Sequence, residues 1–414
     1  MASDKIGILA AFGFWMLLHG CLVGQVKVRT VDGGLFEGRL TASSEQGDLV
    51  LAGADGKTRR LSARRVLWIR WSEPKASEPG VGSRLLRFDL WGGDRVFGEI
   101  QSSDFDSVVL KHSLLGRLEI PLDAVHQVMV LANSTRRGEH LGEDAPKDRD
   151  VIFMRSGKSI DTLAGDLIRF KKSAAVFEWG SEESTFRFNE DRVVAIRLAD
   201  DDVVARPEGL HAQVLLKDGS RLTGRFFRSE SGPFRLQSPL GLDVEIQESA
   251  LVEVGFRGGD FVFLSDLEPA RVEETPYIQG DLKFGLHRDE GLRGGPPTIS
   301  DEYFLKALCV HSRCAVTYRL DGRFESFVAA VGLDGHTAGK DVPGSVAFSV
   351  LGDGRAVSPV TVMKAGEPAR WISVSSLGDV KKLTLLADFS ENFHFNGWAV
   401  WGDPVLVLPR STTR

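Results

Sequence analysis

The sequence predicts an all-β protein made of several small domains. Runs in which apolar and polar residues alternate, as in half-buried strands, recur along the chain, and the repeats show no helical periodicity. A motif of two glycines and a closing apolar pair occurs four times between residues 26 and 258. The 414 residues also exceed what a single core usually holds. We therefore expect tandem small β-barrel repeats followed by an antiparallel β-sandwich.

The composition excludes several classes of protein. With 42% hydrophobic and 26% charged residues, the chain has enough apolar material to fold and too little charge to stay disordered. A net charge of -6 supplies no electrostatic attraction to nucleic acid, so no nucleic-acid partner is expected. Three cysteines are too few for a disulfide scaffold or an array of zinc ribbons.

The first 25 residues have the pattern of a signal peptide. Positions 6–18 are uncharged and apolar, a length that suits a signal peptide and falls short of the ~20 residues that span a bilayer. We expect residues 1–25 to direct export to the cell envelope or beyond it. The run ends in Leu-His-Gly-Cys, which resembles a bacterial lipobox, so Cys21 is a candidate for lipidation and membrane anchoring. The alternative is an ordinary signal peptide cut near Gly24 or Gln25.

Four repeats follow, at residues 26–72, 85–131, 151–199 and 212–258. In each, a strand leads to a turn glycine and then to a second strand that contains another glycine. The two glycines are five residues apart in copies one, two and four and eight apart in copy three: Gly33 and Gly38, Gly93 and Gly98, Gly157 and Gly165, Gly219 and Gly224. The closing anchors are separated by 59, 68 and 58 residues, at Val66, Val125, Val193 and Leu251. This regularity predicts four copies of one architecture.

Each copy is long enough for a small barrel. In the first copy, turns before or at Gly33, Gly47 and Gly56 leave about five short strands, and closing these into a barrel removes exposed strand edges. The pattern resembles the Sm-like small barrel, and a four-bladed propeller is the rival arrangement.

The segments between the copies bear on their arrangement and role. Linkers rich in proline, glycine or charge, at 72–83, 132–150 and 199–211, favour separate barrels over blades around one axis. Basic residues from Lys57 to Arg65 occur in one copy alone, so we interpret them as a solvated strand face. The repeats are therefore expected to act as a spacer or scaffold.

Residues 265–410 have a different character. Strand-like runs between glycine or aspartate turns continue, but the repeat anchors stop, which predicts a β-sandwich. Six segments resemble the NPCBM family of carbohydrate-binding modules in order and spacing: 307–318 (ALCVHSRCAVTY), 324–327, 331–334 (VGLD), 344–350 (GSVAFSV), 380–386 and 401–406 (WGDPVL). The resemblance implies a galactose-binding-like jelly-roll β-sandwich whose partner is a glycan or polysaccharide and which carries out no reaction.

The chain departs from the family pattern at three places. Cys309 stands where the family has glycine, and Gly335 stands where it has a second aspartate. The acidic, glycine-rich loop of the family is replaced by residues 390–398, which contain a single carboxylate. The last departure falls in the loop on which ligand or calcium contacts would depend.

This loop nevertheless supplies the candidate carbohydrate-binding residues. Trp398 offers an aromatic face for a sugar ring, and Asn392, His394 and Asn396 offer the few polar groups that a sugar site needs. The alternatives are core packing for the tryptophan and ordinary turn chemistry for the loop. Trp401 lies at an odd separation from Trp398, so one of the two rings should point inward.

Other notable side chains have structural interpretations. His311 lies in an apolar strand and is expected to be buried and hydrogen-bonded. Cys309 and Cys314 would point to opposite faces of one strand about 16 Å apart, too far for a disulfide, so we expect two buried thiols. No contiguous calcium loop is present and no cofactor is expected, apart from a candidate structural calcium held by Asp334, Asp353, Asp388 and Asp403.

Catalytic signatures are missing from the sequence. Residues 156–159 imitate the end of a phosphate-binding loop, but the required glycine is absent and strands follow in place of a helix. No zinc-protease or nucleophile-elbow motif occurs. The first hypothesis is thus an exported, non-catalytic carbohydrate-binding protein. The alternatives are an envelope structural or protein-interaction protein, and a hydrolase with an unrecognised site in the repeats.

Overall fold

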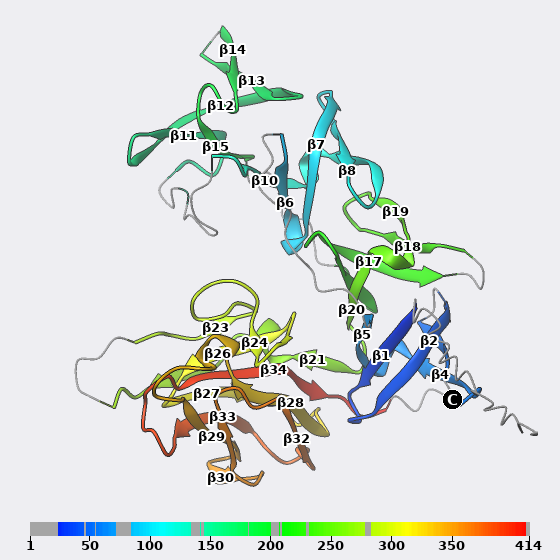
Figure 1. Ribbon diagram of the computed structural model, residues 1–414, viewed down its shortest axis with the longest axis vertical. Helices are drawn as coiled ribbons and strands as arrows, with labels where there is room; N and C mark the ends of the chain where they lie inside the picture. The colour runs from blue at the N-terminus through cyan, green and yellow to red at the C-terminus, as the bar shows by residue number, and fades with distance from the viewer. Residues whose placement is uncertain are drawn as a thin grey trace, which may run out of the picture.

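The computed structural model describes residues 24–44, 47–53, 55–71, 84–133, 141, 145–180, 182–199, 207, 209–228, 232–277 and 283–410. Within these ranges the chain consists of β-strands and six single-turn 3-10 helices without any α-helix, so the all-β prediction is confirmed (Figure 1). No helix in the same ranges is long and apolar enough to cross a membrane. Cys21 and the rest of the expected signal peptide before Gly24 lie outside the described residues.

Four five-stranded units with one topology make up the N-terminal part. Unit 1 contains β1 (Gln25–Thr30), β2 (Leu35–Ser43), β3 (Asp48–Ala52), β4 (Thr58–Ser62) and β5 (Val66–Trp71). Unit 2 contains β6 (Leu86–Leu90), β7 (Arg95–Ser103), β8 (Ser107–His112), β9 (Gly116–Pro121) and β10 (Val125–Val130). Unit 3 contains β11 (Asp150–Ser156), β12 (Ser159–Lys171), β13 (Ala174–Trp179), β14 (Glu182–Arg187) and β15 (Val193–Arg197). Unit 4 contains β16 (His211–Leu216), β17 (Arg221–Arg228), β18 (Phe234–Gln237), β19 (Asp243–Ile246) and β20 (Leu251–Arg257).

In every unit the strands form an antiparallel meander whose fifth strand returns to pair with the first. The order in unit 1 is therefore β4-β3-β2-β1-β5, and the other units repeat it. A 3-10 turn precedes the fifth strand in units 1, 2 and 4, at η1 (Ala63–Arg65), η3 (Leu122–Ala124) and η4 (Glu248–Ala250). The four closing anchors of the sequence pattern are each the first residue of a fifth strand and at most 1% exposed: Val66, Val125, Val193 and Leu251.

The two repeated glycines of each copy have different structural roles. The first lies in the turn between strands one and two with φ between 63° and 90°, a conformation that side chains with a Cβ rarely adopt, at Gly33, Gly93, Gly157 and Gly219. The second lies where the long second strand changes partner from the first strand to the third. There a Cβ would come within 2.2–2.6 Å of a backbone oxygen of the third strand, at Gly38, Gly165 and Gly224. This close approach lets the sheet fold over its core.

The units are joined to one another through hydrogen-bonded strands. Fifth strands pair across units: β5 pairs with β20 through the register Arg70 with Glu253, and β10 pairs with β15. Units 2 and 4 meet where Asp94 accepts hydrogen bonds from Thr223. The units therefore touch in the order 3, 2, 4, 1, as Figure 1 shows from top to bottom.

The separate barrels that the linkers favoured are not what the structure contains. One cluster of buried apolar residues runs through all four units, and their strands belong to one extended sheet. The propeller is not observed either, since the units do not follow each other around an axis. The physical reason is the fifth strand, whose free edge would otherwise leave unpaired N–H and C=O groups.

The C-terminal part is a sandwich of two six-stranded sheets. One sheet contains β21 (Phe261–Phe263), β23 (His287–Arg288), β26 (Ala307–His311), β34 (Trp398–Val407), β28 (Ser326–Leu333) and β32 (Arg370–Ser375). The other contains β22 (Arg271–Glu274), β27 (Cys314–Arg319), β33 (Lys382–Phe389), β29 (Ser345–Gly352), β30 (Arg355–Ala356) and β31 (Thr361–Lys364). The core between them includes the fully buried rings of Tyr318, Phe327, Phe348 and Trp401. Because β21 pairs with β34, the sandwich begins four residues before the expected Ser265.

The sandwich packs directly against units 1 and 4. Arg70 of β5 lies between Glu253 of β20, at 2.6 Å, and Glu302 of the sandwich, at 2.5 Å, while its guanidinium covers the ring of Trp68 at 3.9 Å. Trp68 Nε1 donates a hydrogen bond to Asp403 Oδ2 at 2.9 Å. Burial raises the pKa of Asp403 to about 7, although the charge of Arg70 acts against this shift. The sandwich is thus fixed on the repeats by buried polar contacts as well as by the chain.

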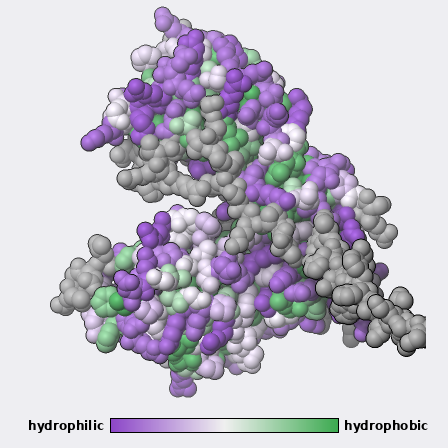
Figure 2. Space-filling model, viewed as in Figure 1, coloured by the Kyte–Doolittle hydropathy of each residue, from purple (hydrophilic) through white to green (hydrophobic). Residues whose placement is uncertain are grey.

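Polar side chains cover most of the face that Figure 2 shows. On the face shown in Figure 2, hydrophilic residues predominate over both the repeats and the sandwich, and hydrophobic ones form small separate patches. The apolar residues are accordingly concentrated in the cores.

Candidate functional site

Several loops meet at one end of the sandwich. The turn after β26, the loop after β28 and the loop before β34 all lie at this end, because His311 pairs with Trp398 and Leu333 pairs with Ala399. The short hairpin of β24 (Thr298–Ile299) and β25 (Glu302–Tyr303) contacts the loop after β28, because Thr298 is hydrogen-bonded to Asp334 and Gly335. We call this the loop end. It contains every sugar-binding candidate of the sequence.

Trp398, the first residue of β34, is half-buried at the loop end. Its ring and that of His336 form a T-shaped contact, with centroids 4.3 Å apart. Phe284 and His311 also pack near the ring, with centroids at 5.6 Å and 6.3 Å. Trp401, by contrast, is fully buried in the core against Phe348. One tryptophan is therefore inside and the other reaches the surface, as the odd separation predicts.

A hydrogen-bonded pair, Asp334 and His336, lies beside Trp398. His336 Nδ1 donates to Asp334 Oδ1 at 2.8 Å, and the same oxygen accepts from the backbone N–H of His336 and from Thr298 Oγ1. In the tautomer that carries its proton on Nδ1, His336 has Nε2 as a hydrogen-bond acceptor. Asp334 Oδ2 takes no hydrogen bond from the residues that the structure describes. The pair thus presents directional polar atoms next to an aromatic ring.

Sequence reasoning did not assign this pair to the sugar site. The sequence suggests Asp334 only as a candidate calcium ligand and gives no indication of a role for His336. A local signal does exist, because Asp334 precedes the single turn η6 (Gly335–Thr337) and caps it by accepting from His336 N. The contact with Trp398 is long-range and leaves no such signal.

The two candidate asparagines hold the loop in place. Asn392 Nδ2 donates to the carbonyl of Pro343 at 2.8 Å, and Asn396 Nδ2 donates to the carbonyl of Val342 at 2.7 Å. Asn396 also has φ of 49°, a left-handed conformation that asparagine tolerates. Their amide nitrogens are therefore engaged in tying the loop before β34 to the loop after β28.

His394 belongs to a group of exposed rings. Its ring stacks on Phe395 at 4.5 Å and on Tyr277 at 5.3 Å, and Tyr277 also contacts Phe393 at 5.1 Å. Tyr277, Phe393 and Phe395 are each about half exposed. The candidates of the loop are thus divided between this outer group and the inner site formed by Trp398.

The remaining candidates are structural. His311 is buried, shares a 2.8 Å hydrogen bond between Nδ1 and the carbonyl of Ser312, and stacks on Phe284. Cys309 and Cys314 are buried free thiols, as predicted, and burial raises the pKa of both. The four aspartates considered for calcium do not converge, and no three potential metal ligands cluster anywhere in the described ranges. Asp403 lies at the repeat interface, and Asp353 accepts from the backbone of Lys381 and Lys382.

Comparisons with known proteins assign the sandwich. Residues 261–407 match the family model of the NPCBM/NEW2 domain. The chain is 30% identical over 110 residues to the "Putative endo-alpha-N-acetylgalactosaminidase" of Renibacterium salmoninarum, a match that covers 26% of this chain and 7% of that protein.

Solved structures include two similar modules from Clostridium perfringens. One is the CBM51 of GH95 in complex with methyl-galactose, at 21% identity and a TM-score of 0.31, with 36% of this chain and 99% of that chain covered. The other contains CBM51-2 of ZmpB in complex with GlcNAc, at 21% identity and a TM-score of 0.32, with 44% and 39% covered. The residues that match the NPCBM/NEW2 family model, 261–407, coincide with the C-terminal sandwich, which is thus similar to this family of domains.

Proposed function

We propose that this protein is an exported, non-catalytic carbohydrate-binding protein whose sandwich binds a glycan at the loop end. The observation that carries the proposal is the half-buried ring of Trp398 beside the hydrogen-bonded pair of Asp334 and His336. A sugar ring combines an apolar face with hydroxyl groups, so an aromatic ring next to fixed acceptors suits it. The family of the domain supports the same ligand class.

The candidate residues take different roles in this proposal. Trp398 packs on the sugar, while Asp334 Oδ2 and His336 Nε2 accept hydrogen bonds from its hydroxyls. Asn392 and Asn396 shape the loop through the hydrogen bonds of their amide nitrogens, and in our proposal their amide oxygens accept hydrogen bonds from the sugar. His394, with the exposed rings around it, extends the surface on which a longer glycan could lie.

The repeats serve as a rigid support. Their strand order and the 3-10 turn before the fifth strand support the Sm-like relationship that we propose for them. Their direct contact with the sandwich through Arg70 supports a role in orienting the glycan site.

Among the described residues, a buried cluster of His112, Ser220 and Asp218 resembles a hydrolase site in composition. The geometry of this cluster argues against the hydrolase alternative. His112 Nε2 lies 3.1 Å from Ser220 Oγ and 3.3 Å from Asp218 Oδ2, while Nδ1 accepts from the backbone N–H groups of Leu114 and Leu115. Nε2 therefore carries the proton and cannot accept one from the serine. A catalytic triad places the acid on the other ring nitrogen, and Ser220 is fully buried. This cluster serves as a contact between units 2 and 4.

A glycan array probed with the whole protein tests the proposal. We expect binding with Kd on the order of 10 μM to 1 mM, because a shallow site keeps about 4–7 kcal/mol after ordering costs. Trp398→Ala should weaken binding at least tenfold. Trp179→Ala, which removes an exposed tryptophan of unit 3, is the matched control and should leave binding unchanged. If no glycan binds in the presence or absence of calcium, the protein-interaction alternative replaces this proposal.

Export and anchoring are proposed from the sequence alone. Mass spectrometry of the protein from its source cells should find a chain that lacks the first ~20 residues. If Cys21 carries a lipid, Cys21→Ser should release the protein from the membrane fraction. An intact Met1 end would contradict export, and an unmodified start at Gln25 would contradict the anchor alone.

A further inference from the structure

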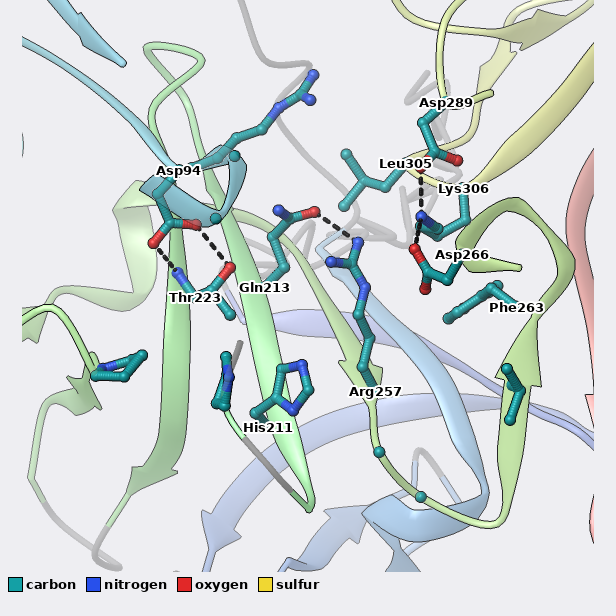
Figure 3. A pocket seen from close by; sticks show the side chains of 18 of the residues that line it. Asp94, His211, Gln213, Thr223, Arg257, Phe263, Asp266, Asp289, Leu305 and Lys306 are labelled. Atoms are coloured by element: carbon teal, nitrogen blue, oxygen red, sulfur yellow. Dashed lines mark hydrogen bonds and ion pairs between the residues drawn. The ribbon is translucent and has the colours of Figure 1, made fainter. Parts of the chain in front are cut away.

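A cavity of about 540 Å³ lies where unit 2, unit 4 and the sandwich meet (Figure 3). Unit 2 contributes the turn after β6 with Asp94, unit 4 contributes β16, β17 and β20, and the sandwich contributes Phe263, Leu305 and Lys306. The volume lies within the range of small-molecule sites in proteins. None of the residues that line the cavity belongs to the loops around Trp398, so the cavity is a different site from the loop end.

The two basic side chains Lys306 and Arg257 of this cavity differ in how many carboxylates lie close to them. Lys306 is paired with two carboxylates, Asp266 at 2.6 Å and Asp289. Arg257 differs, because its Nη2 donates to the neutral amide oxygen of Gln213 at 2.9 Å. No carboxylate of the described residues forms an ion pair with Arg257. Within the part of the chain that the structure describes, Arg257 therefore has one neutral hydrogen-bond partner and no carboxylate at ion-pair distance, although the charge of Asp94 also acts on it.

Hydrogen-bond donors also exceed acceptors around Arg257. Both carboxylate oxygens of Asp94 are used, since Oδ2 accepts from Thr223 N at 2.7 Å and Oδ1 accepts from Thr223 Oγ1 at 2.6 Å. Gln213 Nε2 donates to no group among the described residues. As Figure 3 shows, Gln213 and Arg257 lie side by side between the Asp94 and Thr223 pair and the Lys306 cluster. The donors of Arg257 and Gln213 therefore favour a ligand rich in hydrogen-bond acceptors in this part of the cavity.

We propose that the cavity binds a small carboxylate of about the size of a monosaccharide. The planar fork of Arg257 matches the two oxygens of a carboxylate, and Gln213 Nε2 supplies a third donor beside it. Phe263 and Leu305 form an apolar wall against which the body of the ligand packs. The site does not depend on sugar binding at the loop end, and each can exist without the other.

Calorimetry with the whole protein tests this site with two carboxylates that differ in the polarity of the rest of the molecule. Galacturonate represents a sugar acid, and benzoate represents an apolar carboxylate of similar size; galactose, which lacks the charge, is the neutral control. We expect one of the two carboxylates to bind with Kd on the order of 10 μM to 1 mM. Galacturonate would identify a sugar acid, and benzoate an apolar acid. Absence of binding by both overturns the proposal.

Variants locate the binding. Arg257→Gln should weaken it at least tenfold, whereas Arg235→Gln, an exposed arginine of the same unit with carboxylate partners, should change it less than twofold. Trp398→Ala should have no effect, and loss of carboxylate binding in that variant would place the ligand at the loop end instead. If Arg257→Gln fails to fold, two other measurements replace it: the Kd of the Gln213→Leu variant and the dependence of the Kd of the unmodified protein on salt concentration. A Kd that changes in neither measurement overturns the proposal.

Discussion

Replacing Arg70 by methionine should break the contact that fixes the sandwich on the repeats. The change removes the positive charge between Glu253 and Glu302 and the group that partly compensates Asp403. Glu253 and Asp403 are 1% and 2% exposed, so water cannot replace the lost partner, whereas Glu302 can rehydrate. Leaving a buried charge unpaired costs about 3–5 kcal/mol. We expect a loss of that size in the free energy of unfolding.

Urea unfolding monitored by tryptophan fluorescence measures the effect, since Trp68 lies under the guanidinium. Arg117→Met is the matched control, because Arg117 and Glu119 are exposed and such surface pairs contribute at most about 1 kcal/mol. Adding Glu253→Gln to Arg70→Met should recover part of the loss, as it removes the unpaired charge. A loss for Arg70→Met no larger than that for Arg117→Met would refute the account of the interface.

Three further changes test other parts of the structure. Burial raises the pKa of Asp94 to about 6 from an unfolded value near 3.9, so the native state binds more protons between these values. The stability of the wild type relative to Asp94→Asn should therefore fall by about 2–3 kcal/mol from pH 4 to pH 6 and then stay level; a difference independent of pH contradicts this. Gly224→Ala places a Cβ 2.2 Å from the carbonyl oxygen of Gln237 and should cost about 1–3 kcal/mol in urea unfolding, whereas Gly378→Ala enters open space and should cost little. Trp401→Ala removes a fully buried ring and should cost about 3–5 kcal/mol by thermal unfolding, and a loss below 1 kcal/mol would show that the core collapses around it.

The sequence was informative about each repeat and uninformative about their contacts. Gly219 and Gly224 mark a turn and a strand crossing, both of which depend on local backbone geometry, so the strand pattern could be predicted from them. The pairing of β5 with β20 has no local signal, because any fifth strand of the array has a similar apolar pattern. The linkers rich in proline and glycine therefore favoured separate domains, whereas the units are joined by strand pairing.

In the candidate site, too, local features could be predicted from the sequence and long-range contacts could not. Trp398 and its loop were recognised from a short segment and a family resemblance. Phe284 and His311, which pack near the same ring, are 114 and 87 positions away from Trp398. The pairing of β26 with β34 brings His311 to it, and the pairing of β23 with β26 brings the segment of Phe284. The donor pair of Arg257 and Gln213 depends likewise on two strands of unit 4 lying next to each other.

The pairing of units 1 and 4 has a consequence for the order in which the chain can fold. The outer edge of β5 finds its partner only when β20 exists, and Arg70 and Glu253 are 183 positions apart. At about 5–20 residues per second, a ribosome needs roughly 10–40 s to make this segment. During that time an apolar strand with the sequence VLWIRW has a free edge, which is the usual starting point of aggregation. Arg70, the penultimate residue of this strand, makes wrong partners costly, since a strand without a carboxylate at the position of Glu253 would bury its charge unpaired.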